Sequence, residues 1–91
     1  INPLKGFSPK GDGINDFWLI KGIEDFPNNE VKVFNRWGNL VYEAKNYNNQ
    51  DIAWRGESNG RLGGSNTAET TYYFLIKVEG LEPVSGYVIM K

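Results

Sequence analysis

Hydrophobic and polar residues alternate most clearly along residues 30–44. Val31 and Val33 share one face of this stretch, and Phe34 falls on the opposite face. A period of two over β-branched and aromatic residues predicts a strand. Residues 37–39 (WGN) then supply glycine and asparagine, which tolerate the positive φ that a hairpin turn needs. The pattern predicts a hairpin, and other strands must cover its apolar face because an isolated hairpin is marginally stable in water.

The second strand of this hairpin is expected to alternate strictly. Leu40 and Tyr42 are predicted to face one side, and Val41 and Glu43 the other. The same reasoning predicts four further strands, at residues 17–21, 52–56, 70–79 and 85–91.

Each of these strands has an expected buried face. Trp18 and Ile20 share a face of the first, and Ile52 and Trp54 share a face of the second. The strand at 70–79 carries the strongest signal, and its expected core residues are Tyr72, Phe74, Ile76 and Val78. A short connection predicts that it forms a hairpin with the strand at 85–91.

Turn-forming residues occupy the rest of the chain. Residues 7–16 are too rich in glycine, proline and Asx for a helix or a central strand. Residues 45–51 are expected to form a loop with Tyr47 folded onto the core, and residues 57–69 a surface loop. No segment longer than a turn or two has a helical period. We therefore predict an all-β domain, an antiparallel sandwich or a small barrel.

Composition excludes several classes of protein. The 91 residues suffice for one domain, and 10 Lys and Arg against 11 Asp and Glu leave a net charge of −1. A nucleic-acid interface needs a basic excess, so no nucleic-acid partner is expected. The chain has no cysteine and no histidine, which excludes disulfides and thiolate metal sites and removes the commonest general base. No apolar run approaches the roughly 20 residues of a membrane span.

One segment could hold a metal ion. Asp12, Asn15 and Asp16 place three oxygen-bearing side chains close together among glycines. Hard cations such as calcium prefer oxygen ligands on a tightly turning backbone. The segment lacks the bidentate glutamate of an EF-hand, however, and Lys10 opposes a cation. The alternative is an Asx-rich turn whose side chains bind backbone N–H groups. Calcium is the only cofactor that the sequence suggests.

The three tryptophans allow two interpretations. Trp18, Trp37 and Trp54 could form an aromatic platform for sugars, which would make the chain a carbohydrate-binding adhesion module. A small β-domain also uses large aromatic side chains to fill its core. The strand positions of Trp18 and Trp54 favour burial, whereas Trp37 lies at a turn and is the best candidate for exposure.

Catalysis finds little support in the sequence. A glycosidase needs two carboxylates, but no spacing among Glu24, Asp25, Asp51 and Glu57 singles out a pair. Serine and threonine hydroxyls have no histidine to activate them, and so short a chain leaves little room for a cleft. We therefore expect a protein that is not an enzyme.

Several segments together resemble one known family. They are residues 7–18 (FSPKGDGINDFW), 33–42 (VFNRWGNLVY), 71–74 (TYYF) and 86–89 (GYVI). This pattern is similar to the gliding motility-associated C-terminal domain, the type B sorting domain of the type IX secretion system in Bacteroidetes. Two departures stand out. Lys10 replaces a usual asparagine, which weakens a metal role for that motif, and the connection at 61–69 is longer than usual.

The resemblance implies an immunoglobulin-like β-sandwich of about six to eight strands, with residues 1–6 as a linker and residues 7–91 as the sorting domain. Such domains end large secreted proteins, often cell-surface adhesins that serve gliding. They route a large N-terminal cargo from the periplasm across the outer membrane to the cell surface or the medium. The implied partners are outer-membrane components of the secretion system.

A recognition site built from strand edges and turns exists only in the folded domain. The terminal strand, which carries Tyr87, is one candidate, because its last residues are fixed in position by the end of the chain. Lys91 adds a cation and the C-terminal carboxylate at one point there. The turn formed by Arg36, Trp37 and Gly38 is the other. Both candidates stay open at the level of the sequence.

Overall fold

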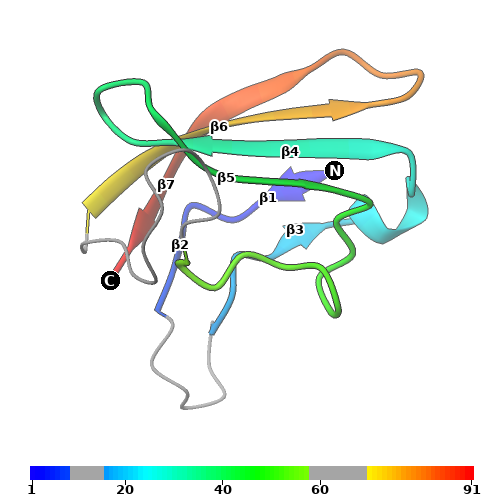
Figure 1. Ribbon diagram of the computed structural model, residues 1–91. Coiled ribbons are helices and arrows are strands. Elements are labelled where there is room, and N and C mark those ends of the chain that lie inside the picture. Colours follow the sequence, from blue (N-terminus) through cyan, green and yellow to red (C-terminus); the bar gives the residue numbers. More distant parts are fainter. Residues whose placement is uncertain (9–15, 58–69) are drawn as a thin grey trace.

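The computed structural model describes residues 1–8, 16–57 and 70–91 of the chain. Its elements are β1 (Asn2–Pro3), β2 (Gly6–Phe7), β3 (Ile20–Lys21), the 3-10 turn η1 (Ile23–Asp25), β4 (Asn29–Phe34), β5 (Leu40–Lys45), β6 (Thr70–Val78) and β7 (Val84–Met90). These strands form a two-stranded sheet, β1-β3, and a five-stranded sheet, β2-β7-β6-β4-β5. Figure 1 shows the two sheets as opposed layers. The predicted all-β sandwich of six to eight strands is confirmed.

The large sheet alternates between a buried face and an outer face, as a period of two requires. Strands β5, β4, β6 and β7 pair antiparallel, and β2 joins β7 in parallel. The buried face of β6 consists of Tyr72, Phe74, Ile76 and Val78, as predicted. On β4 the buried positions are Asn29, Val31 and Val33. Both predicted hairpins, β4–β5 and β6–β7, are therefore confirmed.

A β-bulge breaks the alternation that was predicted for β5. Val33 pairs with Tyr42 but its neighbour Phe34 pairs with Leu40, so Val41 is an extra residue in the ladder. Val41 and Tyr42 are consequently both buried, at 2% and 4% exposure. The expectation that they face opposite sides is wrong, because a bulge turns consecutive residues toward the same layer.

The second layer is less regular than the sequence suggested. The strand predicted at residues 17–21 is limited to Ile20–Lys21, and none forms at residues 52–56. Beyond these strands, Leu4 N donates to Leu19 O at 3.0 Å, which continues the β1–β3 register by one residue, and Trp18 N donates to Trp54 O at 2.9 Å. The prediction failed because β1 pairs with β3 over only two residues. Residues 46–57 complete the layer without strand structure.

Tyr47 holds this irregular segment in place. Its side chain is fully buried, as predicted, and its hydroxyl donates to Trp18 O at 2.6 Å. The oxygen of the Tyr47 hydroxyl also accepts from Trp54 N at 2.7 Å. The Tyr47 hydroxyl therefore pairs with the Trp18 carbonyl and the Trp54 N–H. In a regular sheet, backbone groups of a neighbouring strand would pair with them.

Two buried asparagines support the same segment. Asn29 donates through Nδ2 to Phe26 O at 2.8 Å and to Tyr47 O at 3.2 Å, and its Oδ1 accepts from Tyr47 N at 2.8 Å. Asn49 accepts from Ile20 N at 2.9 Å and donates to Ile20 O at 2.8 Å. The Asn49 amide thus bonds the edge of β3 much as a neighbouring strand would. Side chains replace a ladder that the backbone does not form.

The N-terminal residues belong to the folded body. Residues 1–6, where the sequence suggested a linker, carry β1 and the first residue of β2. Lys5 O accepts from Ile89 N at 2.8 Å, which extends the pairing with β7. In the described ranges, no helix has the length and apolar character needed to cross a membrane.

We predict that Tyr47→Phe lowers the free energy of unfolding by about 1–3 kcal/mol, because it leaves the Trp18 carbonyl and the Trp54 N–H buried without their partner. Chemical denaturation would measure this change. Tyr73→Phe is the matched control, since Tyr73 is 48% exposed. It should change stability by less than about 0.5 kcal/mol. Equal stability of the two variants would contradict the role assigned to the Tyr47 hydroxyl.

Buried phenols also make stability depend on alkaline pH. Burial, with a smaller effect of the Glu57 carboxylate, raises the pKa of Tyr42 to about 12. Burial likewise raises the pKa of Tyr47 above its usual value. Phenols of the unfolded chain ionise near pH 10, so above that pH the unfolded state binds fewer protons than the folded state. We expect the free energy of unfolding to fall as pH rises from 10 toward 12, and to fall less steeply in Tyr42→Phe. An identical pH slope in wild type and variant would show that the Tyr42 pKa is not raised.

Candidate functional site

The tip of the β4–β5 hairpin is a preorganised turn. Asn35 Oδ1 accepts from the backbone N–H groups of Trp37 and Asn39, both at 3.0 Å. Gly38 N donates to Asn35 O at 3.0 Å, and Gly38 has φ of 83°, a conformation that a residue with a Cβ rarely adopts. Asn35 and Gly38 thus fix the backbone of the tip, so Gly38 has a structural role in this candidate site.

Trp37 projects from the tip beside a cation. Its side chain is 71% exposed, and the Arg36 guanidinium carbon lies 4.4 Å from the centroid of its ring. That distance is within the range of a cation–π interaction. Tryptophan and arginine are the residues most enriched among binding hot spots. The tip therefore carries, side by side, the two residue types that are most common at binding hot spots.

Tyr87 lies on the outer face of the large sheet, in a row of aromatic residues. It pairs with Tyr73 of β6, which pairs in turn with Phe34 of β4. Tyr73 and Tyr87 are 48% and 39% exposed. The structure therefore links Tyr87, through Phe34, to the strand that leads into the Arg36–Trp37 tip. We call Phe34, Tyr73 and Tyr87 the aromatic row.

Sequence reasoning did not identify Phe34 and Tyr73 as candidate binding residues. The alternation along β4 and β6 had already placed both on the outer face, away from Val33 and Phe74. The missing information was the strand register, which brings β4, β6 and β7 together. An aromatic residue at an outward position of each strand was the available signal, because such residues form an exposed apolar patch when the register brings them side by side.

Lys91 lies at the same end of the sheet. Its backbone N–H donates to Phe7 O at 3.0 Å, and its side chain is exposed. Lys5, two residues before Phe7, places Nζ 5.9 Å from the centroid of the Tyr87 ring. Figure 1 shows the end of β7 and the tip of the β4–β5 hairpin at the same end of the molecule. The two candidate surfaces are thus neighbours across the sheet.

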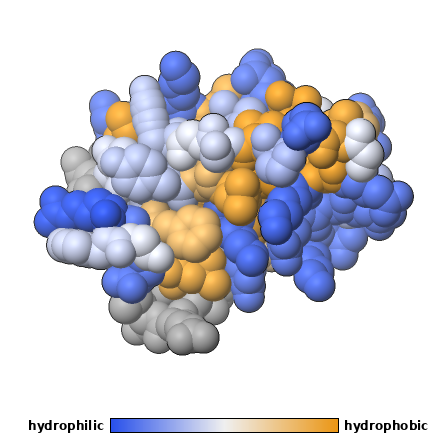
Figure 2. Space-filling model, turned by 90° about the horizontal axis from the view of Figure 1, so that it is seen from above, coloured by the Kyte–Doolittle hydropathy of each residue, from blue (hydrophilic) through white to orange (hydrophobic). Residues whose placement is uncertain are grey.

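The outer face of the sheet is apolar along its middle. Figure 2 views the molecule from above Figure 1 and shows hydrophobic side chains as a band between hydrophilic ones. Besides the aromatic row, Leu75 and Ile89 occupy outward positions on β6 and β7 and are half-buried. A band of this kind is typical of a surface that contacts another molecule.

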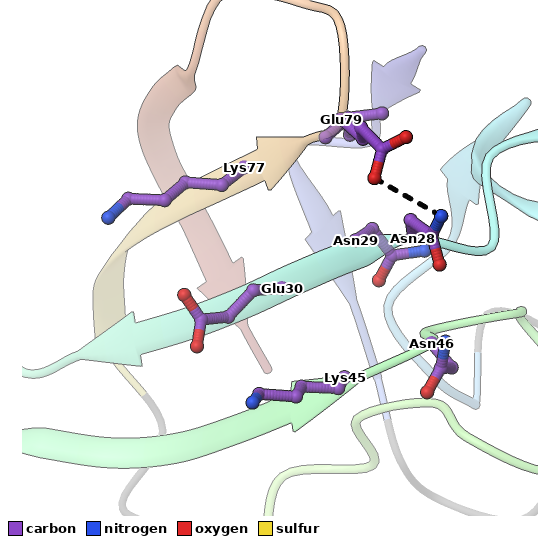
Figure 3. A pocket seen from close by; sticks show the side chains of 8 residues that line it. Asn28, Asn29, Glu30, Lys45, Asn46, Lys77 and Glu79 are labelled. Atoms are coloured by element: carbon purple, nitrogen blue, oxygen red, sulfur yellow. Dashed lines mark hydrogen bonds between the residues drawn. The ribbon is translucent and has the colours of Figure 1, made fainter.

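A polar depression lies at the opposite end of the sheet. Figure 3 shows Glu30 of β4 between Lys45 of β5 and Lys77 of β6, and the register places them as cross-strand neighbours. Asn28 Nδ2 donates to Glu79 Oε2 at 3.3 Å. Opposite charges on adjacent strands balance each other on a sheet surface. This depression offers solvated, neutralised charges and is a weaker binding candidate than the aromatic row.

The calcium hypothesis falls largely outside the described residues. Asp12 and Asn15 lie in the segment 9–15, and Asp16 is half-buried at its border. Elsewhere in the described part of the chain, no group of three or more acidic side chains could hold a metal ion. Calcium binding at Asp12, Asn15 and Asp16 therefore stays a prediction.

Two of the three tryptophans belong to the core. Trp18 and Trp54 are fully buried, with ring centroids 6.3 Å apart in an edge-to-face arrangement. A sugar platform made of all three tryptophans is therefore wrong, and the expectation that Trp18 and Trp54 fill the core is confirmed. Trp37 alone is exposed, as its turn position suggested.

Comparison with known proteins agrees with this description. A search among curated proteins finds no match. The protein-family comparison matches residues 1–90 to the family described as the CHU_C type IX secretion signal domain. This family consists of secretion signals and is not a known enzyme family. The match covers all of the candidate surface except Lys91 and confirms the resemblance found in the sequence. The chain thus belongs to the CHU_C type IX secretion signal domain family, whose members act as sorting signals for export.

Proposed function

We propose that this chain directs a large cell-surface protein, a gliding adhesin of a Bacteroidetes bacterium, from the periplasm across the outer membrane. The observation that carries the proposal is the family match over residues 1–90. The resemblance to gliding motility-associated domains supports the adhesin as cargo. In this function the chain is fused to the C-terminal end of the cargo and is recognised by outer-membrane components of the type IX secretion system.

The proposed recognition residues are Arg36, Trp37, Gly38, Tyr87 and Lys91. Gly38 contributes by shaping the turn. The β4–β5 tip, which carries Arg36 and Trp37, and the end of β7, which carries Tyr87 and is followed by Lys91, lie at the same end of the molecule (Figure 1). Their positions depend on pairing between strands that lie far apart in the sequence. An unfolded chain would not present them together, so the signal is the folded surface.

Binding, and no covalent chemistry, is what this surface can supply. The exposed Trp37 ring and Arg36 guanidinium offer apolar area and charge-assisted hydrogen bonds. The hydrogen bonds of Asn35 hold the tip in one conformation before a partner arrives. A preorganised contact loses less conformational entropy on binding than a mobile one.

A carbohydrate-binding module is the second candidate, favoured by the exposure of Trp37. Sugar rings stack on exposed aromatic faces, but the Arg36 guanidinium lies over this one. With Trp18 and Trp54 buried, the site would also lack a second tryptophan surface. Screening the isolated domain on a glycan array distinguishes the candidates: a specific sugar ligand that Trp37→Ala abolishes would favour this module over the sorting signal.

We predict that residues 1–91, fused to the C-terminus of a periplasmic reporter, export that reporter in a host with a type IX secretion system. Trp37→Ala should reduce export several-fold without lowering the melting temperature, because the side chain is mostly exposed and buries little area in the fold. Cell fractionation with reporter activity measures the distribution, and thermal melts of the purified fusion measure stability.

Leu81→Ala is the matched control for this experiment. Leu81 is 49% exposed on the β6–β7 turn, at the end of the sheet away from the hairpin tip. It should leave export unchanged. A folded wild-type fusion that stays in the periplasm would refute the sorting function, and equal export by the Trp37 and Leu81 variants would remove Trp37 from the recognition site.

A further inference from the structure

The aromatic row lies on a rigid part of the fold. Phe34, Tyr73 and Tyr87 belong to adjacent strands at the centre of the five-stranded sheet. The surface beside Tyr73 and Tyr87 is open and shallow, and Phe74, Ser85 and Gly86 complete its lining. This lining is mainly apolar. Aromatic side chains on an apolar surface are typical centres of protein interfaces.

Positive charge surrounds the aromatic row. Lys5 lies against Tyr87 at 5.9 Å, and Arg36 lies against Trp37 at 4.4 Å. Lys32 occupies the outward position next to Phe34 on β4, and Glu43 of β5 is its cross-strand neighbour. Within the described residues, this rim therefore carries more cations than carboxylates.

Acidic side chains gather instead at the other end of the sheet. Glu79 and Glu82 lie on the β6–β7 turn, and Glu24 and Asp25 lie in η1. Asn29 at the start of β4 pairs with Val78 at the end of β6. Both acidic segments adjoin this end of the sheet, and Phe34 and Tyr73 lie toward the other end. Among the described residues, carboxylates outnumber cations at this end, although Lys45 and Lys77 lie there on either side of Glu30 (Figure 3). A partner of the aromatic row meets the basic end.

We propose that the aromatic row and Trp37 form one docking surface for a protein whose contact surface has apolar side chains ringed by aspartate and glutamate carboxylates. The apolar centre matches the row, and the acidic ring matches Lys5 and Arg36. This inference rests on the proposed sorting function, since an outer-membrane secretion component is the partner. It adds Phe34 and Tyr73 to the recognition site and specifies the chemistry of the partner.

A lipid surface is the main alternative, because membranes also attract aromatic and basic side chains. Membrane binding depends on buried apolar area and on attraction of net positive charge to anionic lipids. The chain has a net charge of −1. The aromatic row also lies along strands, and only Trp37 projects from a loop tip. A flat apolar surface with a charged rim fits a protein partner better.

The experiment uses the purified 91-residue chain and, as probe, the detergent-solubilised outer-membrane complex of a type IX secretion system. The double variant Tyr73→Ser, Tyr87→Ser should bind about tenfold or more weakly than wild type, since it removes the apolar centre. Arg36→Glu should weaken binding and reduce its dependence on salt, because a like charge would face the acidic ring. Leu81→Ser is the matched control, with similar exposure at the other end of the sheet, and should bind as wild type does.

Circular dichroism and melting temperature establish that each variant is folded, and Arg36→Glu keeps the test valid if the double variant unfolds. Binding of Arg36→Glu to the complex with wild-type affinity and salt dependence would overturn the proposal. So would a wild-type chain that exports the reporter but does not bind the complex.

Vesicles of phosphatidylcholine and phosphatidylglycerol form the second probe. If the wild type binds vesicles and not the complex, the occupant is a membrane. Each of these outcomes would refute the docking proposal and leave the sorting function intact. A folded wild-type fusion that is retained in the periplasm would instead refute the sorting function.

Discussion

The second layer of this sandwich depends on the hydroxyl of Tyr47. The layer contains a two-residue pairing between β1 and β3, and residues 46–57 lie beside it without strand structure. Backbone groups in such a segment must find partners when they are buried. Tyr47 supplies them for the Trp18 carbonyl and the Trp54 N–H, beside the direct bond from Trp18 N to Trp54 O. Without that hydroxyl the layer would keep its other hydrogen bonds, but two buried backbone groups would lose their partner.

This arrangement divides the aromatic residues of the chain into two groups with different roles. The inner group packs edge-to-face around Trp54, which lies 5.1 Å from Phe7 and 5.4 Å from Tyr72 between ring centroids. The outer group, Tyr73 and Tyr87, faces solvent on the same sheet. The first group fills the core, and the second contributes a cross-strand aromatic pair on the sheet surface. In the proposed docking surface, this outer pair also contacts the partner.

Sequence patterns predicted the parts of the fold that the large sheet governs. Strict alternation identified β4 and β6, because one face of each is buried against the core. The same rule failed at Val41, where a bulge adds one residue, and at residues 52–56, where Ala53 and Trp54 are consecutive buried residues. Bulges and side-chain hydrogen bonds depend on contacts between distant residues, so local periodicity does not reveal them.

The candidate site was predicted only in part, because some of its residues also come together through contacts between distant parts of the chain. The turn at Trp37 is a local feature, and its glycine and asparagine identified it in the sequence. The aromatic row depends on the register that aligns Phe34, Tyr73 and Tyr87, and register follows from the fold as a whole. Sequence reasoning therefore found Trp37 and Tyr87 of the proposed surface and missed Phe34 and Tyr73, which lie between them in the register.

The parallel pairing of β2 with β7 determines how the domain responds to tension. Hydrogen bonds from Ile89 N to Lys5 O and from Lys91 N to Phe7 O join strands that run in the same direction. If the N-terminal end of β2 and the C-terminal end of β7 are pulled apart, these bonds are loaded in shear. All of them then resist together, whereas antiparallel strands pulled from one end separate bond by bond. A load applied between β2 and the end of β7 would therefore act on both of these bonds at once.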